Sequence, residues 1–599
     1  MPCSPPSWRR TSLLALALLP PAVLGVAPTP ARDLFLAGGA LAICSDLSPR
    51  ACTAPPAAEP GQARRAPAHY RLDAPGIARA MTPALWTHPG APDAAMRSRW
   101  LQAAAEETQG ARLDAVAMED ALAAICVADT CAATDAMRPW SVLLDAERAA
   151  VLAALEVPAL DATGERPKAR ARPAQSRVPG GVDVLRAFVA AAQARTRGRP
   201  KVAVVTASAF DPMDPVDFYV DAFRELGADA VWWPVDAAAA AARFERGDCA
   251  ALPALRAERL RLVGREAIYP DLARFQHDHC ASQPALMLQV QGVFFAGGDQ
   301  WRHRQAFVHA DDRANPWLQE LQQAHAAGRV VVGGTSAGAA VQSGAWMLGN
   351  GDVEAAVARA ARVAPPPEPG CARGGRCGGL PEDALTLWPA GGLRLADGAI
   401  ADTHFSERSR ELRLLMAMQA ADARWGYGAD ETSALHVRTV GARREIRAIG
   451  EAGGWVLRRP ASMRDEAEAW YLVPGATLVV EEGLPPNAEG ADALGERVTL
   501  AIDPGTPGPL RERRPLPPSA FDPGALRDAA QRLAWRCGSG LRLPAAPGMA
   551  ALDCADGARG WRRPDRAGRD EGDEGDARVR PVTHGVGPLR LRFLRATST

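Results

Sequence analysis

A serine set among small residues is the strongest candidate nucleophile in the chain. Ser336 lies in the stretch Val-Val-Val-Gly-Gly-Thr-Ser-Ala-Gly-Ala-Ala, where a β-branched run ends in two glycines just before the serine. This is the layout of a nucleophile elbow, a sharp strand-to-helix turn that lifts a serine hydroxyl above the edge of a sheet. Small neighbours are needed because a larger side chain would collide with the turn or the substrate. The alternatives are a bare glycine turn and a phosphate cradle, although the P-loop lysine and the G-x-G-x-x-G pattern are both missing.

A serine hydroxyl needs a base within hydrogen-bond reach, and the base needs an acid that fixes its tautomer. His404 follows an expected strand and opens an expected helix, so it is the best candidate base; the alternative is a helix cap or a surface histidine. Two carboxylates compete for the role of the acid. Glu354 comes shortly after the elbow, and Glu431 lies in a Gly-Tyr-Gly-Ala-Asp-Glu turn. The residues alone do not choose between them.

Two further groups could contact a substrate. Arg408, Arg410 and Arg413 are expected in the first turns of a helix, where cations face the positive end of the helix dipole. An anion such as a substrate carboxylate is therefore expected close to them, unless they are simply solvated in an arginine-rich chain. The backbone amides of Gly298, after a strand that ends in two glycines, and of Ala337 are expected to form an oxyanion hole. A plain turn is the alternative at Gly298.

Strands and helices alternate around these residues. We expect strands at 33–37, 201–207, 228–233, 292–296 and 329–332, and helical stretches at 182–194, 216–226, 303–326 and 337–346. This alternation predicts an α/β fold with a mostly parallel sheet and helices on both faces, flavodoxin-like in its layers. Ligands of such folds gather at the carboxyl ends of the strands, where Ser336 would lie.

The chain divides into five expected parts. These are a signal peptide (1–27), the first strand of the catalytic domain (28–46), a helical insertion with Pro/Ala-rich linkers (47–178), the catalytic domain (179–440) and a β-rich accessory region (441–599) with a charged, partly disordered patch at 563–578. Within the insertion we expect helices at 97–106 and 116–125. The apolar run after Arg9 and Arg10 is too short to span a bilayer comfortably, so we expect export and no membrane association after cleavage; an uncleaved tether is the alternative. The protein is thus expected to be secreted or periplasmic, by Sec or Tat export.

Composition and cysteine usage agree with an exported enzyme. The 599 residues include 69 basic and 69 acidic ones, so the net charge of zero gives no reason to expect nucleic acid as a partner. Ten cysteines follow the signal, and in an exported protein we expect disulfides in sequence order: Cys44/Cys52, Cys126/Cys131, Cys249/Cys280, Cys371/Cys377 and Cys537/Cys554. Metal binding around His277, His279 and Cys280 is the rival, but no spacing matches a zinc site and we expect no metal. A homodimer is left open.

The motifs, taken in order, resemble a known family. Gly-Gly-Asp-Gln, Gly-Thr-Ser-Ala-Gly-Ala, Asp-x-His-Phe-Ser-x-Arg-x-Arg and Gly-x-Gly-x-Asp-Glu together resemble cyanophycinase, within the peptidase E-like serine peptidases. The resemblance covers residues 33–39 and 182–440, around half of the chain. It implies a fold similar to class I glutamine amidotransferases, with serine in place of cysteine at the elbow and no cofactor. It also implies a substrate, cyanophycin, which is a poly-aspartate backbone carrying arginine on its β-carboxyls and is cut to β-aspartyl-arginine dipeptides.

The resemblance assigns roles residue by residue. Ser336 matches the nucleophile and His404 the base, while both Glu431 and Glu354 match positions where an acid is assigned. Positions that match substrate-binding residues are Gln300, Asp402, Arg408, Arg410 and Arg413, with Asp402 suited to the substrate guanidinium and the arginines to its carboxylates. At the neighbouring position, Thr403 replaces a typical glutamine, which makes short aspartyl or isoaspartyl peptides an alternative substrate. A non-catalytic exported binding module of the same fold is the alternative from a different class.

Overall fold

The computed structural model describes residues 30–595, apart from the segments 56–66, 128–137, 162, 283–286, 288, 345, 461–465, 486–487, 509–516, 536–539 and 563–583. The signal peptide expected at 1–27 and the charged patch expected at 563–578 lie outside the described residues. Among the helices that are described, none combines the length and the apolar character needed to cross a membrane.

The larger of the two main sheets has nine strands and carries Ser336. Five parallel strands form one half: β1 (Ala31–Ala37), β5 (Val331–Thr335), β4 (Gly292–Phe295), β2 (Lys201–Val205) and β3 (Asp229–Trp232). On the other side of β1 follow four antiparallel strands: β11 (Ser433–Val440), β12 (Arg443–Gly450), β15 (Ala476–Glu481) and β16 (Arg497–Ile502). The chain is α/β as expected, but the sheet is mixed and not mostly parallel. The parallel half alone matches the predicted strand–helix alternation.

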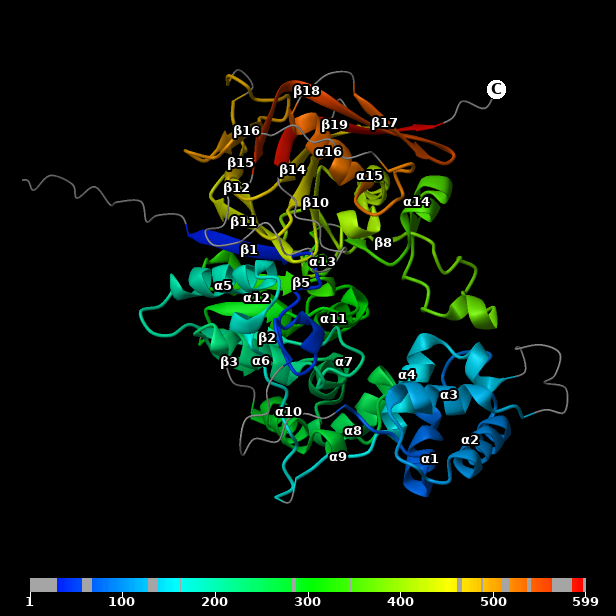
Figure 1. Cartoon of the computed structure of the whole chain (residues 1–599). Coiled ribbons are helices and arrows are strands. Elements are labelled where there is room, and N and C mark those ends of the chain that lie inside the picture. The colour runs from blue at the N-terminus through cyan, green and yellow to red at the C-terminus, as the bar shows by residue number, and fades with distance from the viewer. Residues whose placement is uncertain are drawn as a thin grey trace, which may run out of the picture.

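Helices cover both faces of the parallel half (Figure 1). Along β1, Leu34 packs into a core that includes α12 (Pro316–Ala326), whereas the next residue, Phe35, packs into a second core with α5 (Gly180–Gln193) and α6 (Val216–Glu225). Successive side chains of a strand point to opposite faces, so two cores require apolar residues at every position. This explains the continuous apolar runs of these strands in the sequence.

The second sheet has seven strands and includes the strand before His404. Its order is β17 (Leu541–Ala545), β18 (Gly548–Arg562), β19 (His584–Arg595), β14 (Glu466–Leu472), β13 (Gly454–Arg458), β10 (Trp425–Ala429) and β9 (Ile400–Thr403), and β9 and β10 run parallel. A small third sheet joins β6 (Met347–Leu348), β8 (Thr386–Trp388) and β7 (Arg362–Val363). The boundary expected at residue 440 falls between β11 and β12, which pair from Ser433↔Gly450 to Val440↔Arg443. Strands after residue 441 are therefore continuous with both main sheets.

The helical insertion builds a core of its own. Its helices are α1 (Ala74–Ala80), α2 (Ala94–Thr108), α3 (Ala115–Ala124) and α4 (Asp145–Leu155), and they bury Trp100 and Trp140 among aliphatic side chains. Asp73, Asp93 and Asp114 each accept a backbone N–H at the start of a helix, which satisfies an otherwise unpaired donor. In Figure 1 these blue helices lie to one side of the sheets.

The remaining helices connect the strands. They are α7 (Ala237–Ala240), α8 (Leu252–Leu255), α9 (Arg265–Ile268), α10 (Pro270–Ser282), α11 (Gln300–Phe307), α13 (Ala337–Ala340), α14 (Val353–Arg359), α15 (Glu411–Ala420) and α16 (Ala525–Trp535). The helix expected at 337–346 is shorter than predicted, since α13 ends at Ala340. Beyond it, the carbonyls of Val341 and Gln342 accept N–H groups from the segment 393–396, which prevents the helix from continuing.

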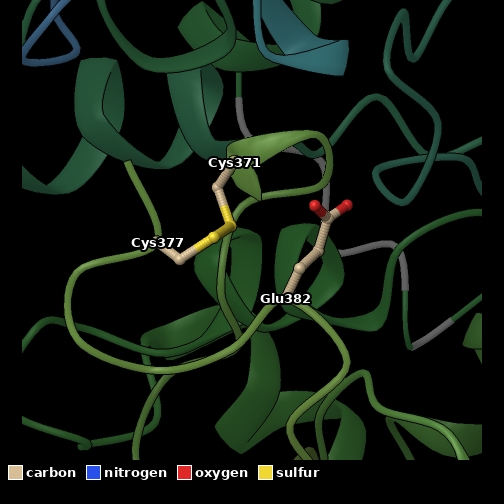
Figure 2. A group of neighbouring side chains, drawn as sticks. All are labelled: Cys371, Cys377 and Glu382. Atoms are coloured by element: carbon tan, nitrogen blue, oxygen red, sulfur yellow. A yellow bond between two sulfur atoms is a disulfide. The ribbon is translucent and has the colours of Figure 1, made fainter. Parts of the chain in front are cut away.

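Three of the expected disulfides are present. Cys44–Cys52, Cys249–Cys280 and Cys371–Cys377 pair in sequence order, while Cys131 and Cys537 lie outside the described residues. Figure 2 shows the bonded sulfurs of Cys371 and Cys377 beside Glu382. The Glu382 carboxylate accepts the backbone N–H groups of Gly370 and Ala372 and so stabilises this loop. These hydrogen bonds account for the position of Glu382 without a bound ion. Disulfides are compatible with a protein of an oxidising compartment.

Candidate active site

Ser336 occupies a strained turn between β5 and α13. Its φ of 53° and ψ of −122° are rarely adopted by residues other than glycine, and its N–H donates to the carbonyl of Ala37 (2.9 Å). Glycines on both sides make the turn feasible. A Cβ on Gly334 would lie 2.2 Å from the carbonyl oxygen of Gly338, and a Cβ on Gly338 would lie 2.2 Å from that of Phe295. The geometry is that of the expected nucleophile elbow.

His404 meets Ser336 across the ends of strands from different sheets. The distance from Ser336 Oγ to His404 Nε2 is 2.8 Å. The His404 backbone N–H donates to the carbonyl of Gly38 (2.7 Å), which ties the loop after β9 to the loop after β1. Gly39, at φ 110°, lies against the imidazole, and a Cβ there would be 2.3 Å from Cε1. The two glycines that follow β1 therefore position the imidazole, Gly38 by accepting the His404 N–H and Gly39 by leaving room for the ring.

Of the two candidate acids, the structure brings Glu431 to the imidazole. Glu431 Oε1 lies 2.6 Å from His404 Nδ1, so with Nδ1 protonated the ring donates to the carboxylate and Nε2 is free to accept from Ser336. The hydrogen bond from His404 lowers the pKa of Glu431, which favours the ionised carboxylate. Glu354 lies on the exposed side of α14 and is not part of this chain of hydrogen bonds.

The expected oxyanion donors lie beside the elbow. A Cβ on Gly297 would be 3.4 Å from the Cβ of Ser336, so the loop after β4 passes next to the serine. Among the described residues, no acceptor is found for the amides of Gly298 and Ala337, and both are free to donate to a bound oxygen. Gln300 is the first residue of α11, and its side-chain amide donates to the carbonyl of Leu348 (3.1 Å).

Asp402 is not available to a substrate guanidinium, contrary to expectation. Only 3% of it is exposed, and its carboxylate binds Arg410 (3.1 Å) and Arg413 (2.7 Å). The anion expected near these arginines is therefore supplied inside the protein. Arg413 is also bound to the carbonyl of Gly351, and Thr403 is buried with its carbonyl accepting from Arg410 (2.6 Å). Asp402, Arg410 and Arg413 therefore satisfy one another within the protein.

Arg408 differs from the other two arginines. It lies at the end of a short 3-10 turn, Ser406–Arg408, and its side chain is exposed. Its charge lowers the pKa of Glu431, in addition to the larger effect of the His404 hydrogen bond. Arg408 is thus the one expected substrate-binding arginine that faces solvent near the candidate triad.

Replacing Asp402 by asparagine is expected to lower the free energy of unfolding by about 3–5 kcal/mol, because it leaves two largely buried guanidinium groups without a counter-charge. Burial acts to raise the pKa of Asp402, but the charges of Arg413 and Arg410 outweigh it and lower that pKa. The ion pairs of Asp402 therefore stabilise the protein at neutral pH, and this stabilisation is lost as the pH falls through the pKa of Asp402 in the folded state. Chemical denaturation measures the change.

Asp397→Asn is the matched control for Asp402→Asn. Asp397 pairs with Arg32 at 2.8 Å, with the two side chains 40% and 29% exposed. An exposed pair contributes at most about 1 kcal/mol. Equal losses in the two variants would contradict the internal role of Asp402.

Behind Glu431 lies a polar cluster to which the sequence analysis gave no role. The Glu431 N–H donates to Glu407 (3.1 Å), and the neighbouring Asp430 accepts from the Tyr471 hydroxyl (2.9 Å). Arg527, from α16, binds both Glu407 (2.6 Å) and Asp430 (3.3 Å). Asp430 belongs to the Asp-Glu motif, and Glu407 lies within the motif that contains His404. Arg527 lies almost a hundred positions further on, without a motif to mark it.

Comparisons with known proteins give a limited match. No family model matches the chain. Over 139 residues, or 23% of its length, it is 34% identical to a cyanophycinase from Geminocystis herdmanii (strain PCC 6308), and it spans 40% of that protein. A crystal structure of a peptidase from an acI-B1 Actinobacterium aligns with 48% of this chain and 86% of that chain, at a TM-score of 0.28 and 14% identity. The chain therefore has a distant sequence relationship to a cyanophycinase, over less than half of that protein's length.

Proposed function

We propose that this protein is an exported serine peptidase of cyanophycinase type. The observation that carries the proposal is the unbroken chain of hydrogen bonds from Ser336 through His404 to Glu431, at 2.8 Å and 2.6 Å. This is the arrangement that activates a serine hydroxyl as a nucleophile. The distant relationship to a cyanophycinase supports the substrate class, and the disulfides support export.

The proposed reaction is hydrolysis of a peptide bond in two steps. His404 Nε2 takes the proton of the Ser336 hydroxyl as Oγ attacks the substrate carbonyl, and the amides of Gly298 and Ala337 bind the resulting oxyanion. The imidazolium, stabilised by ionised Glu431, then gives its proton to the leaving amine, and an acyl-enzyme remains. Water, deprotonated by His404, attacks this ester, and His404 then returns the proton to Ser336 Oγ as the acid product is released. In this proposal Ser336, His404, Glu431 and the two backbone amides act with the substrate and one water molecule.

The proposed substrate is cyanophycin, cut to β-aspartyl-arginine dipeptides. The exposed guanidinium of Arg408 is suited to a substrate carboxylate near the triad. The occupied Asp402 favours a second candidate, because a substrate without an arginine side chain does not need a free carboxylate at that position. Short aspartyl or isoaspartyl peptides are therefore the alternative substrates of the same chemistry.

Product analysis tests the substrate. Purified protein is incubated with cyanophycin and, separately, with a panel of aspartyl and isoaspartyl dipeptides, and the products are identified by mass spectrometry. We expect soluble β-aspartyl-arginine from cyanophycin. Cleavage of the dipeptides alone would favour the second candidate, and inertness toward both would contradict the peptidase proposal.

A further inference from the structure

The C-terminal helix α16 is joined to the loop that carries His404. The Gly524 N–H donates to the carbonyl of Ser406 (2.6 Å), and the hydroxyl of Ser409 donates to the carbonyl of Asp522 (2.6 Å). Figure 1 shows α16 in orange beside β18 and β19 of the second sheet. A segment more than a hundred residues away in sequence is therefore fixed to the backbone two positions after His404.

From α16, the Arg527 guanidinium connects this segment to Glu431. Its Nη1 lies 2.6 Å from Glu407 Oε1 and 3.3 Å from Asp430 Oδ2, and its side chain is only 14% exposed. The other carboxylate oxygen of Glu407 accepts the backbone N–H of Glu431 (3.1 Å). Asp430 precedes Glu431 directly and accepts the Ser406 N–H (2.9 Å) through Oδ1. Arg527 thus holds two carboxylates that flank the residue behind the imidazole.

The charges around Glu431 are unbalanced without Arg527. Four acidic side chains gather here, namely Glu407 and Glu411 from the loop and start of α15, and Asp430 and Glu431 from the turn after β10. The facing partners are His404, Arg408, Arg527 and the Tyr471 hydroxyl of β14. Burial raises the pKa of Glu407 to about 7 and that of Glu411 to about 8, so near neutral pH Glu411 is mostly uncharged, and the negative charges are those of Asp430, Glu431 and partly ionised Glu407. Arg527 is the buried cation among these groups, and its charge, after the larger effect of the His404 hydrogen bond, also lowers the pKa of Glu431.

We propose that Arg527 is a positioning residue for the candidate triad, which neutralises Glu407 and Asp430 and so keeps Glu431 ionised and directed at His404. This inference rests on the proposed function, since it gives a role to a residue that acts through Glu431. It also gives the C-terminal region a part in the reaction. The backbone contacts of Gly524 and Asp522 do not involve the Arg527 side chain, so a substitution at Arg527 is expected to leave α16 docked.

The proposal predicts opposite pH effects for two substitutions. Arg527→Gln removes a cation close to Glu431, which favours the protonated form of the hydrogen-bonded pair behind Ser336, so the acid limb of kcat/KM should move to higher pH by at least about half a unit. Glu407→Gln removes a carboxylate that is partly ionised near neutral pH, retains an oxygen for the Glu431 N–H, and should move the same limb to lower pH by a smaller amount. A purely structural role predicts lower activity in both variants without opposite shifts. Arg527→Lys restores the charge and should restore the pH profile in large part.

The experiment uses the full-length protein and two readouts. The first is the pH dependence of kcat/KM on whichever peptide the wild type cleaves. The second is the downfield proton resonance of the short His404–Glu431 hydrogen bond, followed by NMR as a function of pH, which does not require turnover. Arg532→Gln, on the exposed side of α16, is the matched control and should titrate as the wild type does.

The outcomes separate this inference from the peptidase proposal. Opposite shifts in Arg527→Gln and Glu407→Gln in the resonance titration support it even if no substrate is cleaved. If the wild type is active but Arg527→Gln titrates as the wild type or as Arg532→Gln does, the inference is overturned. Should Arg527→Gln fail to fold, the other two variants decide. A pH profile shifted to lower pH in Glu407→Gln, together with a near-normal profile in Arg527→Lys, supports the proposal. An unchanged profile in Glu407→Gln, or a profile shifted to higher pH in either variant, overturns it.

Discussion

Ser336→Ala is expected to lower kcat for peptide hydrolysis by at least about 10³-fold. The substitution deletes the attacking oxygen, so His404 has no hydroxyl proton to accept. Alanine retains the Cβ of serine, and the backbone strain at φ 53° is the same in both proteins. The loss should therefore appear in kcat without a matching loss of stability.

Steady-state kinetics with the substrate identified by product analysis measure this effect, and thermal unfolding checks the fold. Labelling by a serine-directed fluorophosphonate gives a second readout: the wild type should be modified at Ser336 and Ser336→Ala should not. Ser282→Ala, at an exposed position on α10, is a control for the loss of a hydroxyl far from the site. An active Ser336→Ala would remove Ser336 from the mechanism, whatever the substrate is.

The parallel half of the larger sheet could be predicted because its cause is local. Strands covered on both faces must be apolar at every position, and the runs that became β2 and β5 show this directly in the sequence. The elbow was predictable for a similar reason, since only small residues fit between Phe295 and the turn. The antiparallel half of the sheet could not be predicted. β12 has the alternating pattern of a half-buried strand, but that pattern does not indicate which strand it pairs with.

Long-range pairing also explains what sequence reasoning missed in the site. Asp402, Arg410 and Arg413 are close in sequence, and they were interpreted as facing a substrate because their mutual contacts depend on how β9 and α15 pack. His404 reaches Ser336 although β9 and β5 belong to different sheets, because the loop after β1 connects the two. Arg527 could not be found at all, since its partners precede it by about a hundred positions and surface arginines are abundant in this chain.

Glu431→Gln is expected to lower kcat by about 10²–10⁴-fold. The short bond from His404 Nδ1 requires an acceptor that carries charge, and ionised Glu431 supplies it at 2.6 Å. A glutamine can turn its NH₂ group to Nδ1, which would leave the proton on Nε2. That tautomer donates to Ser336 where it should accept, so the serine is no longer activated. Glutamine also lacks the negative charge that stabilises the imidazolium as it forms.

Glu354→Gln is the matched control for Glu431→Gln, because it makes the same chemical change at the other carboxylate that the sequence proposed. Glu354 is exposed on α14, so its substitution should alter kcat by less than about twofold, as surface changes usually do. Both variants are compared at neutral pH, above the lowered pKa of Glu431, where the wild-type carboxylate is ionised.

If Glu354→Gln lost activity and Glu431→Gln retained it, the carboxylate behind the imidazole in the working enzyme would have to come from α14. That exchange would require the turn after β10 to leave the imidazole, although the Thr432 N–H binds the carbonyl of Gly39 (3.0 Å) in the loop on which His404 rests. The same contact is the reason to expect that the triad is already assembled before substrate binds.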